Sequence, residues 1–335
     1  MLRNVDIIVG GQWGSEGKGN IVSAIAHQYD VMVRTGGPNA GHSVMFEGQK
    51  HIFRHLPSGA LHSPNAKLIL GAGSSINVQV LRDEMRDNRI DPGRVIVHPR
   101  AVIIDHEMLE SDHSLWRNSI GGTGQGVGMA AFQKILRDPT QCKLAGDARL
   151  AADLGVNVGV ANLLEPYKRI LVEGSQGVML SLHHGQWPYV TSRDTTPAGL
   201  LAEAGIPPLR VAQVIVCFRT FPIRVANPEN GTSGPMGDEI TWAEVAAQTG
   251  QSLAELEARE HTTTTKKLRR VAKFNIAQFV QACMLSGPTK LALTFADYLQ
   301  KDAVDGLIRA MQDSSDGVPV SYVSTGFGPE HVRTR

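Results

Sequence analysis

The residues best suited to chemistry in this chain stand in a glycine-rich loop near the N-terminus. Residues 5–22 read VDIIVGGQWGSEGKGNIV, in which an apolar run leads into closely spaced glycines, then Lys18, then a second apolar run. A strand, a glycine turn, a lysine and a helix N-terminus together create an anion site, because backbone N–H groups and the helix dipole face the anion. The spacing is distinctive, since five residues separate Gly11 from Gly17 and Gly19 follows the lysine where Ser or Thr is usual. We expect this loop to bind nucleotide phosphates.

Four further segments place polar side chains among glycines or hydroxyls. Residues 34–43 read RTGGPNAGHS, and a histidine in such a loop is suited to protonating an oxyanion near neutral pH. Residues 120–128 read IGGTGQGVG, which leaves backbone amides open to a phosphate or forms a flexible loop. Residues 173–177 read EGSQG, whose glutamine offers a donor and an acceptor to a purine edge. Residues 262–270 read TTTTKKLRR and suit a carboxylate substrate, or form a solvated basic turn.

Composition and charge exclude several classes of protein. The chain has 335 residues, of which 42% are hydrophobic and 19% charged, as in ordinary folded proteins. A net charge of +1 argues against non-specific binding of nucleic acid through a basic surface. Three widely spaced cysteines favour a reducing compartment and exclude a disulfide framework. No apolar run approaches about 20 residues, and the start lacks a signal-peptide layout. We therefore expect a cytoplasmic protein with neither nucleic-acid nor membrane partners.

Short apolar runs that alternate with helix-like segments must position these residues. The pattern predicts an α/β fold, a single domain over residues 1–335 with a large, mostly parallel central sheet flanked by helices and a P-loop-like phosphate site. Ligands in such folds bind at the carboxyl ends of strands, and glycine clusters follow the apolar runs at 5–9, 31–33, 68–70, 170–172 and 320–323. We also expect a helical segment within residues 141–165 and one or two surface helices within 241–259.

In this order the five segments resemble the adenylosuccinate synthetase family over nearly the whole chain. The most specific matches are QWGxEGKG followed by NAGH, then EGxQG, then PYVTS at residues 188–192, and STG at residues 324–326. Members of that family condense IMP with L-aspartate, driven by GTP and with Mg²⁺. The resemblance therefore implies a ligase with two nucleotide pockets that forms a homodimer, with Arg137 reaching into the partner's pocket.

The resemblance also assigns roles to individual residues. It implies a catalytic group with His42 as general acid, namely Ser15, His42 and Lys18. It implies Mg²⁺ ligands, namely Ser15 and Gly41. The acceptor nucleotide would contact Ser15, Asn39, Thr123, Gln125, Arg137, Gln176 and Thr191. The phosphate donor would contact Gly14, Glu16, Gly17, Lys18, Gly19, Gly41, His42, Ser43, Asp297, Ser324 and Gly326. L-Aspartate would contact Thr263, Thr264, Thr265, Lys267 and Arg269.

Three departures from the family pattern bear on the substrates. Ser15 stands where the family has the aspartate that removes a proton from purine N1, and Phe295 replaces the lysine of the guanine-reading TKxD segment. Lys266 and Lys267 replace the Gly-Arg of the aspartate loop. A small neutral serine leaves room for a 2-amino group on the purine. This combination resembles the bacteriophage branch of the family, which joins dGMP to L-aspartate with ATP or dATP on the route to diaminopurine DNA.

We therefore expect dGMP, L-aspartate and ATP or dATP as substrates, Mg²⁺ as cofactor, and the host cytoplasm as location if the chain is phage-encoded. Two alternatives stay open at this point. An ordinary adenylosuccinate synthetase would act on IMP, although Ser15 counts against it. A non-catalytic nucleotide-binding relative would have lost its base, although Lys18, Gly41 and His42 all persist.

Overall fold

Alternate side chains of the strand β1 (Val5–Gly10) enter two different hydrophobic cores. Ile8 belongs to one core, whereas Val5, Ile7 and Val9 belong to the other. Neighbouring side chains of a strand point to opposite faces of the sheet. A strand that is buried on both faces must therefore lie inside a sheet that helices cover on both sides.

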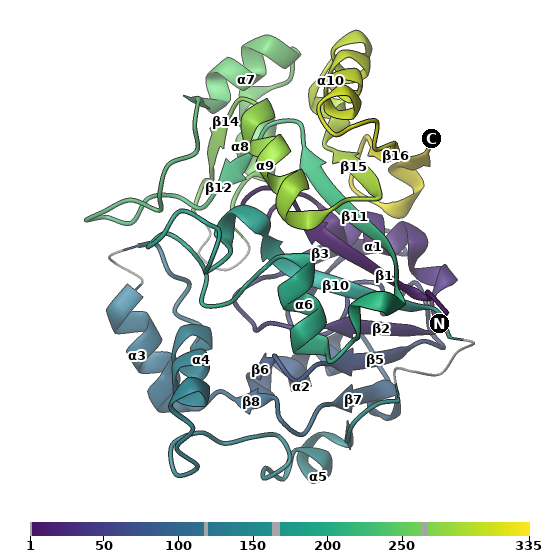
Figure 1. Ribbon diagram of the computed structural model, residues 1–335. Helices are drawn as coiled ribbons and strands as arrows, with labels where there is room; N and C mark the ends of the chain where they lie inside the picture. The colour runs from purple at the N-terminus through teal and green to yellow at the C-terminus, as the bar shows by residue number, and fades with distance from the viewer. Residues whose placement is uncertain (1, 117–119, 163–167, 263–266) are drawn as a thin grey trace.

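The computed structural model describes residues 2–116, 120–162, 168–262 and 267–335 (Figure 1). Its main sheet has ten strands in the order β17-β16-β15-β11-β1-β10-β2-β5-β7-β9. All neighbouring strands pair in parallel except β16 and β17, which are antiparallel. Besides β1, the strands of this sheet are β2 (Val31–Arg34), β5 (Lys67–Leu70), β7 (Val95–Val97), β9 (Asn157–Val158), β10 (Ile170–Gly177), β11 (Val211–Arg219), β15 (Lys290–Thr294), β16 (Val320–Ser324) and β17 (Val332–Thr334).

Helices cover both faces of this sheet. One core contains side chains of α1 (Lys18–Ile25), α2 (Val78–Asp87) and α5 (Leu150–Leu154). The other core contains side chains of α6 (Pro197–Ala204), α9 (Ile276–Ser286) and α10 (Lys301–Asp313). Outside these layers lie α3 (His106–Trp116), α4 (Val127–Leu136), α7 (Trp242–Thr249) and α8 (Leu253–Arg259).

Short elements complete the fold. Three small sheets are formed by β3 (His42–Phe46) with β4 (Gln49–Phe53), by β6 (Ser75–Ile76) with β8 (Val102–Ile103), and by β12 (Ile223–Arg224), β14 (Arg270–Ala272) and β13 (Glu239–Ile240). Single 3-10 turns are η1 (Ala26–Gln28), η2 (Pro92–Arg94), η3 (Val178–Leu180), η4 (Pro208–Arg210), η5 (Ala296–Tyr298) and η6 (Pro329–His331).

The predicted fold class is confirmed. The α/β architecture and its large, mostly parallel sheet agree with the expectation, and α7 and α8 occupy the segment expected to form surface helices. The helical segment expected within residues 141–165 is confirmed only for α5, which spans Leu150–Leu154 and is ended by Gly155, whose φ is 69°. The chain then extends, and Asn157 and Val158 pair with β7 as the edge strand of the sheet.

The carboxyl edge of the sheet gathers the segments that the sequence singled out. The phosphate loop follows β1, the histidine loop follows β2, and the EGSQG segment ends β10. Thr294 and Ser324 end β15 and β16 at the same edge. Within the described residues, none of the helices is long and apolar enough to cross a membrane.

Candidate active site

Glu16 lies inside the phosphate loop and shapes it. Its carboxylate accepts hydrogen bonds from the backbone N–H of Gln12 at 3.1 Å and of Gly14 at 2.6 Å, and from Lys18 Nζ at 2.9 Å. Only glycine fits at position 10, because a Cβ atom there would lie 2.0 Å from Glu16 Oε2. A buried carboxylate therefore holds the turn that precedes the N-terminus of α1.

Lys18 is the first residue of α1, and it is only 2% exposed. Besides Glu16, its ammonium donates to the carbonyl oxygen of Gln176 at 2.7 Å and lies 3.4 Å from that of Gly14. These bonds tie the phosphate loop to the end of β10. The lysine thus brings a fixed positive charge to a helix N-terminus, where the helix dipole also favours an anion.

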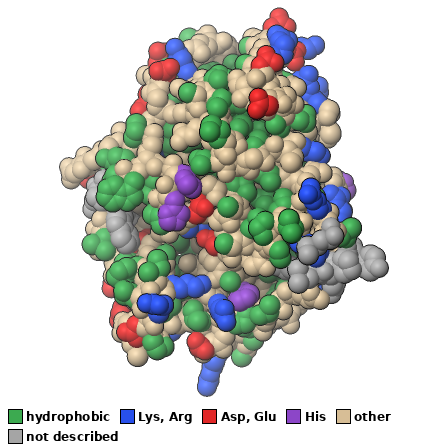
Figure 2. Space-filling model, viewed as in Figure 1, with side chains coloured by type: hydrophobic (Ala, Val, Ile, Leu, Met, Phe, Trp, Pro, Cys, Tyr) green, Lys and Arg blue, Asp and Glu red, His purple; other side chains and the backbone are tan. Residues whose placement is uncertain are grey.

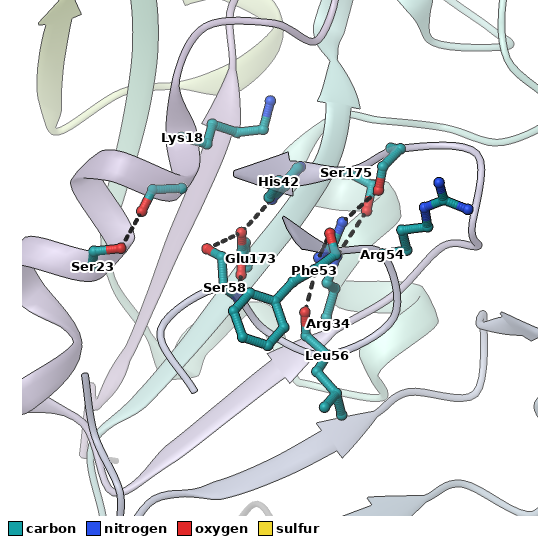
Figure 3. A network of polar contacts seen from close by, with 12 residues as sticks. Lys18, Ser23, Arg34, His42, Phe53, Arg54, Leu56, Ser58, Glu173 and Ser175 are labelled. Carbon is teal, nitrogen blue, oxygen red and sulfur yellow. Dashed lines mark hydrogen bonds and ion pairs between the residues drawn. The ribbon is translucent and has the colours of Figure 1, made fainter. Parts of the chain in front are cut away.

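His42 forms a buried pair with Glu173, at the point where the histidine loop meets β10. Nδ1 of the imidazole is hydrogen-bonded to Glu173 Oε1, and the pair points inward between the strands (Figure 3). Ser58 fixes the carboxylate through its backbone N–H at 2.7 Å and its hydroxyl at 2.6 Å. Among the described residues, Nε2 of His42 has no hydrogen-bond partner. One ring nitrogen is therefore anchored, and the other is buried without a partner among the described residues.

Electrostatics keep this pair in one protonation state. The pKa of His42 is lowered to about 4, chiefly by burial and then by the Arg34 guanidinium, and Glu173 opposes the shift only in part. Burial would raise the pKa of Glu173, but His42, Arg34 and the Ser58 hydroxyl outweigh it and bring that pKa to about 2. At neutral pH the pair is a carboxylate and a neutral imidazole, and the carboxylate selects the tautomer that carries its proton on Nδ1.

Arg34, the last residue of β2, holds the histidine loop in place through hydrogen bonds of its guanidinium. Its guanidinium donates to the carbonyl oxygens of Ala40 at 2.9 Å, Leu56 at 2.8 Å and Phe53 at 3.2 Å. Figure 3 shows this guanidinium lying among the same segments that carry the His42 pair. Because a buried arginine needs several acceptors, the loop around Ala40 is fixed by the same contacts that satisfy the charge.

A second buried network supports the hairpin that carries the TTTTKKLRR segment. Arg219, at the end of β11, donates to Glu260 at 2.7 Å, and the Tyr298 hydroxyl donates to the same carboxylate at 2.7 Å. The backbone N–H of Arg269 donates to the Glu260 carbonyl oxygen at 3.0 Å and closes the hairpin. The Arg219 guanidinium also lies 3.8 Å from the centre of the Phe295 ring.

Two cavities meet at this edge of the sheet. The larger, of about 630 Å³, extends from the phosphate loop to Asp297 and Ser324. The smaller, of about 250 Å³, extends from Asn39 to Thr191. Four residues line both cavities, namely Gly14, Ser15, Gly41 and Arg269. A group bound in one cavity can therefore reach a group bound in the other at this shared wall.

The structure brings most of the predicted site residues to these cavities. The larger cavity is lined by the expected donor residues Gly14, Gly17, Lys18, Gly19, Gly41, His42, Ser43, Asp297, Ser324 and Gly326. The smaller is lined by the expected acceptor and aspartate residues Ser15, Asn39, Thr123, Gln176, Thr191, Lys267 and Arg269. Glu16, Gln125 and Arg137 line neither. Thr263, Thr264 and Thr265 lie outside the described residues.

Sequence reasoning gave no role to several charged residues of the site. Arg34, Glu173, Arg219 and Glu260 are all buried, and each supports a loop rather than standing in one. The signal for two of them was available, because Arg34 and Arg219 each follow an apolar run that ends at the carboxyl edge. A charge at the end of a buried strand in an α/β fold is placed to meet a ligand or to hold the loop that does.

The oxygen donors at the shared wall suit Mg²⁺. Ser15 offers a hydroxyl and Gly41 a carbonyl oxygen, and Mg²⁺ is usually held by few protein ligands together with substrate phosphates. The described part of the chain contains no cluster of three or more His, Cys, Asp or Glu side chains able to hold a metal. The donor set therefore fits an ion that arrives with the phosphates rather than a resident metal centre.

Comparisons with known proteins agree with this architecture. A family model described as adenylosuccinate synthetase matches residues 7–160 and 152–305. Adenylosuccinate synthetase of Methanocaldococcus jannaschii is 36% identical over 355 residues, which covers 100% of this chain and 97% of the relative. The N6-succino-2-amino-2'-deoxyadenylate synthase of Vibrio phage phiVC8 is 37% identical over 348 residues, which covers 98% of this chain and 96% of the relative.

Two solved structures are similar over the whole chain. Succinoaminodeoxyadenylate synthetase of cyanophage S-2L, solved with dGMP and with dATP as an energy donor, superposes with a TM-score of 0.86 at 32% identity and covers 100% of this chain and 96% of that one. The fully ligated adenylosuccinate synthetase of Plasmodium falciparum superposes with a TM-score of 0.86 at 20% identity, and this likeness shows the fold alone.

Proposed function

We propose, since the chain belongs to the adenylosuccinate synthetase family, that it is an ATP- or dATP-dependent ligase that joins L-aspartate to C6 of dGMP. The products would be 2-amino-2'-deoxyadenylosuccinate, a nucleoside diphosphate and phosphate, on the route to diaminopurine DNA. The phage relatives support this assignment by name and by the dGMP and dATP bound to one of them. A phage-encoded enzyme of this kind would work in the host cytoplasm.

Ser15 at the shared wall is the observation that carries the choice of dGMP. Overall identity does not decide it, because the archaeal and the phage relatives are 36% and 37% identical to this chain. Ser15 lines both cavities and stands where the family places an aspartate. A hydroxyl is smaller than a carboxylate, bears no charge, and accepts or donates a hydrogen bond. It therefore leaves space and a polar partner for the 2-amino edge of guanine.

Phe295 and Asp297 support an adenine rather than a guanine donor. Phe295 stands where the guanine-reading segment of the family has a lysine, and its ring packs on the Arg219 guanidinium. Both residues line the larger cavity. An aromatic ring offers a stacking face that accepts any purine, while the Asp297 carboxylate can accept a hydrogen bond from the 6-amino group of adenine. ATP and dATP share both features.

The proposed reaction has two displacement steps. The 6-oxygen of guanine attacks the γ-phosphorus, the bond from that phosphorus to the β-phosphate oxygen breaks, and the N1 proton passes to solvent. The aspartate amine then forms a bond to C6 and releases one proton to solvent, the C6–O6 bond breaks, and phosphate leaves with the oxygen. Charge develops on the transferring phosphoryl oxygens, and Lys18 and the N-terminus of α1 are already oriented to stabilise it.

His42 would become an acid when the donor binds. In the free protein, burial holds its pKa near 4, so the imidazole is neutral at pH 7. A triphosphate beside Nε2 adds negative charge and raises that pKa. Glu173 already holds Nδ1–H, so an additional proton goes to Nε2, from which it can be donated to a phosphoryl oxygen. The general-acid role is therefore a property of the complex.

Ser15 and Gly41 would hold Mg²⁺ together with the phosphates. The ion would neutralise part of the phosphate charge when bound. The protein's own contribution is to aim two oxygen atoms at the shared wall, since Gly41 lies in the loop that Arg34 fixes through Ala40.

The hairpin between Glu260 and Arg269 would bind L-aspartate. Lys267 and Arg269 line the smaller cavity, and Arg269 also lines the larger. The backbone N–H of Lys267 donates to the Thr262 hydroxyl at 3.0 Å, so both ends of the threonine loop are held beside the shared wall. Cations at this place match the two carboxylates of aspartate. Thr263, Thr264 and Thr265 complete the proposed aspartate loop.

A homodimer is the assembly that we propose. The helices α3 and α4 expose a patch made of Leu115, Phe132, Ile135 and Leu136, of which Ile135 is 72% exposed. Figure 2 shows hydrophobic side chains gathered over these two helices. Arg137 follows this patch directly, so a second copy seated on it would receive the arginine near its acceptor cavity. Sedimentation of the purified chain would test this assembly, and a monomer at micromolar concentration would contradict it.

The first experiment is phosphate release with Mg²⁺, ATP and L-aspartate, compared among dGMP, GMP and IMP. Turnover with dGMP well above IMP is the expected result. Turnover with IMP alone would make the chain an ordinary adenylosuccinate synthetase. Turnover with none of the three, under conditions in which ATP binds, would show a nucleotide-binding relative without ligase activity.

A further inference from the structure

Asn20 joins two parts of the larger cavity that are far apart in the sequence. It lies in the first turn of α1, two residues after Lys18, and is only 6% exposed. Its side chain lines the larger cavity and is hydrogen-bonded to the end of β16 and the turn that follows, residues 324–328, which we call the C-terminal loop. Ser324 and Gly326 of that loop line the larger cavity at the end remote from the smaller one.

The amide of Asn20 makes three hydrogen bonds to this one loop. Nδ2 donates to the Ser324 hydroxyl at 2.6 Å and to the Gly326 carbonyl oxygen at 2.9 Å. Oδ1 accepts from the backbone N–H of Gly328 at 2.9 Å. Both donor hydrogens and one acceptor site of the side chain are thus used on residues more than 300 positions away.

Few side chains can reproduce this pattern. An aspartate at position 20 keeps the acceptor but loses both donors, and glutamine is longer by a methylene. The loop is also held from its other side, because the backbone N–H of Thr325 donates to the His331 carbonyl oxygen at 3.1 Å. Ser324 also donates to the Gly326 carbonyl oxygen at 3.0 Å, so Asn20 completes a closed ring of bonds.

We propose that Asn20 is a positioning residue for the nucleoside part of the phosphate donor. This inference rests on the proposed function, in which the triphosphate lies at the start of α1 and the base lies between the C-terminal loop and Phe295. Asn20 sets the distance between these two places, because its helix carries Lys18 and Gly19 while its side chain holds Ser324, Gly326 and Gly328. Asn20 itself lines the larger cavity, but the hydrogen bonds of its amide all go to the C-terminal loop.

The proposed role of Asn20 predicts different effects on the binding of two kinds of ligand. Binding of a nucleoside triphosphate needs both the helix N-terminus and the C-terminal loop in register, whereas inorganic tripolyphosphate needs the helix N-terminus alone. Loss of the Asn20 side chain should therefore weaken ATP and spare tripolyphosphate. Because three hydrogen bonds to one loop would be lost, we expect the affinity for ATP to fall about tenfold.

The test is calorimetric titration of the full chain with Mg²⁺ and either ATP or inorganic tripolyphosphate. We compare the wild type with Asn20→Ala, Asn20→Asp, Lys18→Met and Ser23→Ala. Ser23 is the matched control, because it is buried in the same helix and its hydroxyl donates only to the Gly19 carbonyl oxygen at 2.7 Å. Lys18→Met should weaken both ligands, and Ser23→Ala should weaken neither.

The expected result is a Kd for ATP raised about tenfold by both Asn20 variants, with the Kd for tripolyphosphate unchanged. In turnover assays the KM for ATP should rise while kcat and the KM for dGMP stay constant. Unchanged tripolyphosphate binding also shows that the variants are folded. Equal losses for both ligands, or no loss for ATP, would overturn the inference. Inactivity of the wild type with dGMP despite normal ATP binding would reject the proposed acceptor and leave this result interpretable.

Discussion

The two cavities at the carboxyl edge are built in opposite ways. The larger has a floor of buried ionisable side chains in pairs, namely Lys18 with Glu16, His42 with Glu173, and Arg219 with Glu260. The smaller has no such paired floor: one part of its wall is small and apolar, with Ile120, Gly121, Gly122, Val190, Val225 and Ala226, and another part carries the cations Arg224, Lys267 and Arg269. Preorganised charge stabilises developing charge in a transition state, whereas an apolar wall selects by shape. We therefore assign the electrostatics of catalysis to the first cavity and the choice of purine to the second.

The difference also predicts how each cavity responds to substitution. Breaking a buried pair leaves a partner charge without compensation, and this is costly for binding and for folding. Changing a wall residue alters only the space that a ligand meets. Single substitutions on the floor of the larger cavity should therefore abolish turnover, while those at the shared wall should redirect it.

The largest effect should come from Lys18→Met. The variant removes the fixed cation at the N-terminus of α1, and kcat should fall by about 10³-fold. Steady-state phosphate release measures the loss. Lys290→Met is the matched control, because Lys290 begins β15 at the opposite edge of the sheet, with its Nζ 5.8 Å from the centre of the Tyr322 ring. A comparable loss in the control would show that the sheet, not the site, is affected.

Glu173→Gln should lower kcat by about 10²-fold. The carboxylate raises the pKa of His42, so its loss makes the protonated imidazole harder to form in the donor complex. The pH at which kcat is greatest should accordingly move down. Ser58→Ala is the matched control, because it removes one donor but keeps the carboxylate, so the pH at which kcat is greatest should not move down. A pH profile that is lower but unshifted would assign Glu173 a purely structural role.

Ser15→Asp tests the wall shared by the two cavities rather than the buried pairs of the larger cavity. A carboxylate at the shared wall takes the space proposed for the 2-amino group, so the ratio of kcat/KM for dGMP over IMP should fall by about tenfold. Competition assays with the two nucleotides measure this ratio. Ser15→Ala is the smaller counterpart and should keep the preference for dGMP. An unchanged preference in the aspartate variant would remove the steric argument.

The smallest effect concerns stability rather than turnover. The unfolded chain protonates His42 near pH 6.5, whereas the folded chain keeps it neutral down to about pH 4. The free energy of unfolding should therefore decrease as the pH falls from 6.5 toward 4, by about 1 kcal/mol for this group over the first unit. Urea unfolding at several pH values measures the slope, and His42→Gln should flatten it. An equally steep slope in that variant would contradict the assignment.

The sequence alone predicted the fold and most of the residues that line the two cavities. Apolar runs ending in glycine clusters mark strands and their carboxyl ends, and this local pattern places Lys18, Gly41 and His42 correctly at the cavities. The buried residues behind the cavities could not be predicted in this way, because their partners lie far away in the sequence. Glu173 meets a histidine 131 residues earlier in the chain, and Arg219 meets a glutamate 41 residues later. A single sequence carries no signal for such pairings.

Glu16 shows a second limit of the sequence. Its place in the phosphate loop suggests a donor contact, but its side chain turns into the space that Gly10 leaves open. The direction of a side chain in a turn depends on what the neighbouring backbone admits, and this becomes visible only in three dimensions. Likewise, Gly155 ended a helix that composition alone would have extended.

The wall shared by the two cavities has a kinetic consequence. In the proposed function the two nucleotides bind in separate cavities that share Gly14, Ser15, Gly41 and Arg269, so neither would have to leave before the other enters. Initial-rate plots at varied concentrations of both nucleotides should therefore intersect, as for a ternary complex, and should not run parallel as for a substituted enzyme. Both nucleotides would then be bound at the same time, and the protein itself would form no covalent intermediate with either of them.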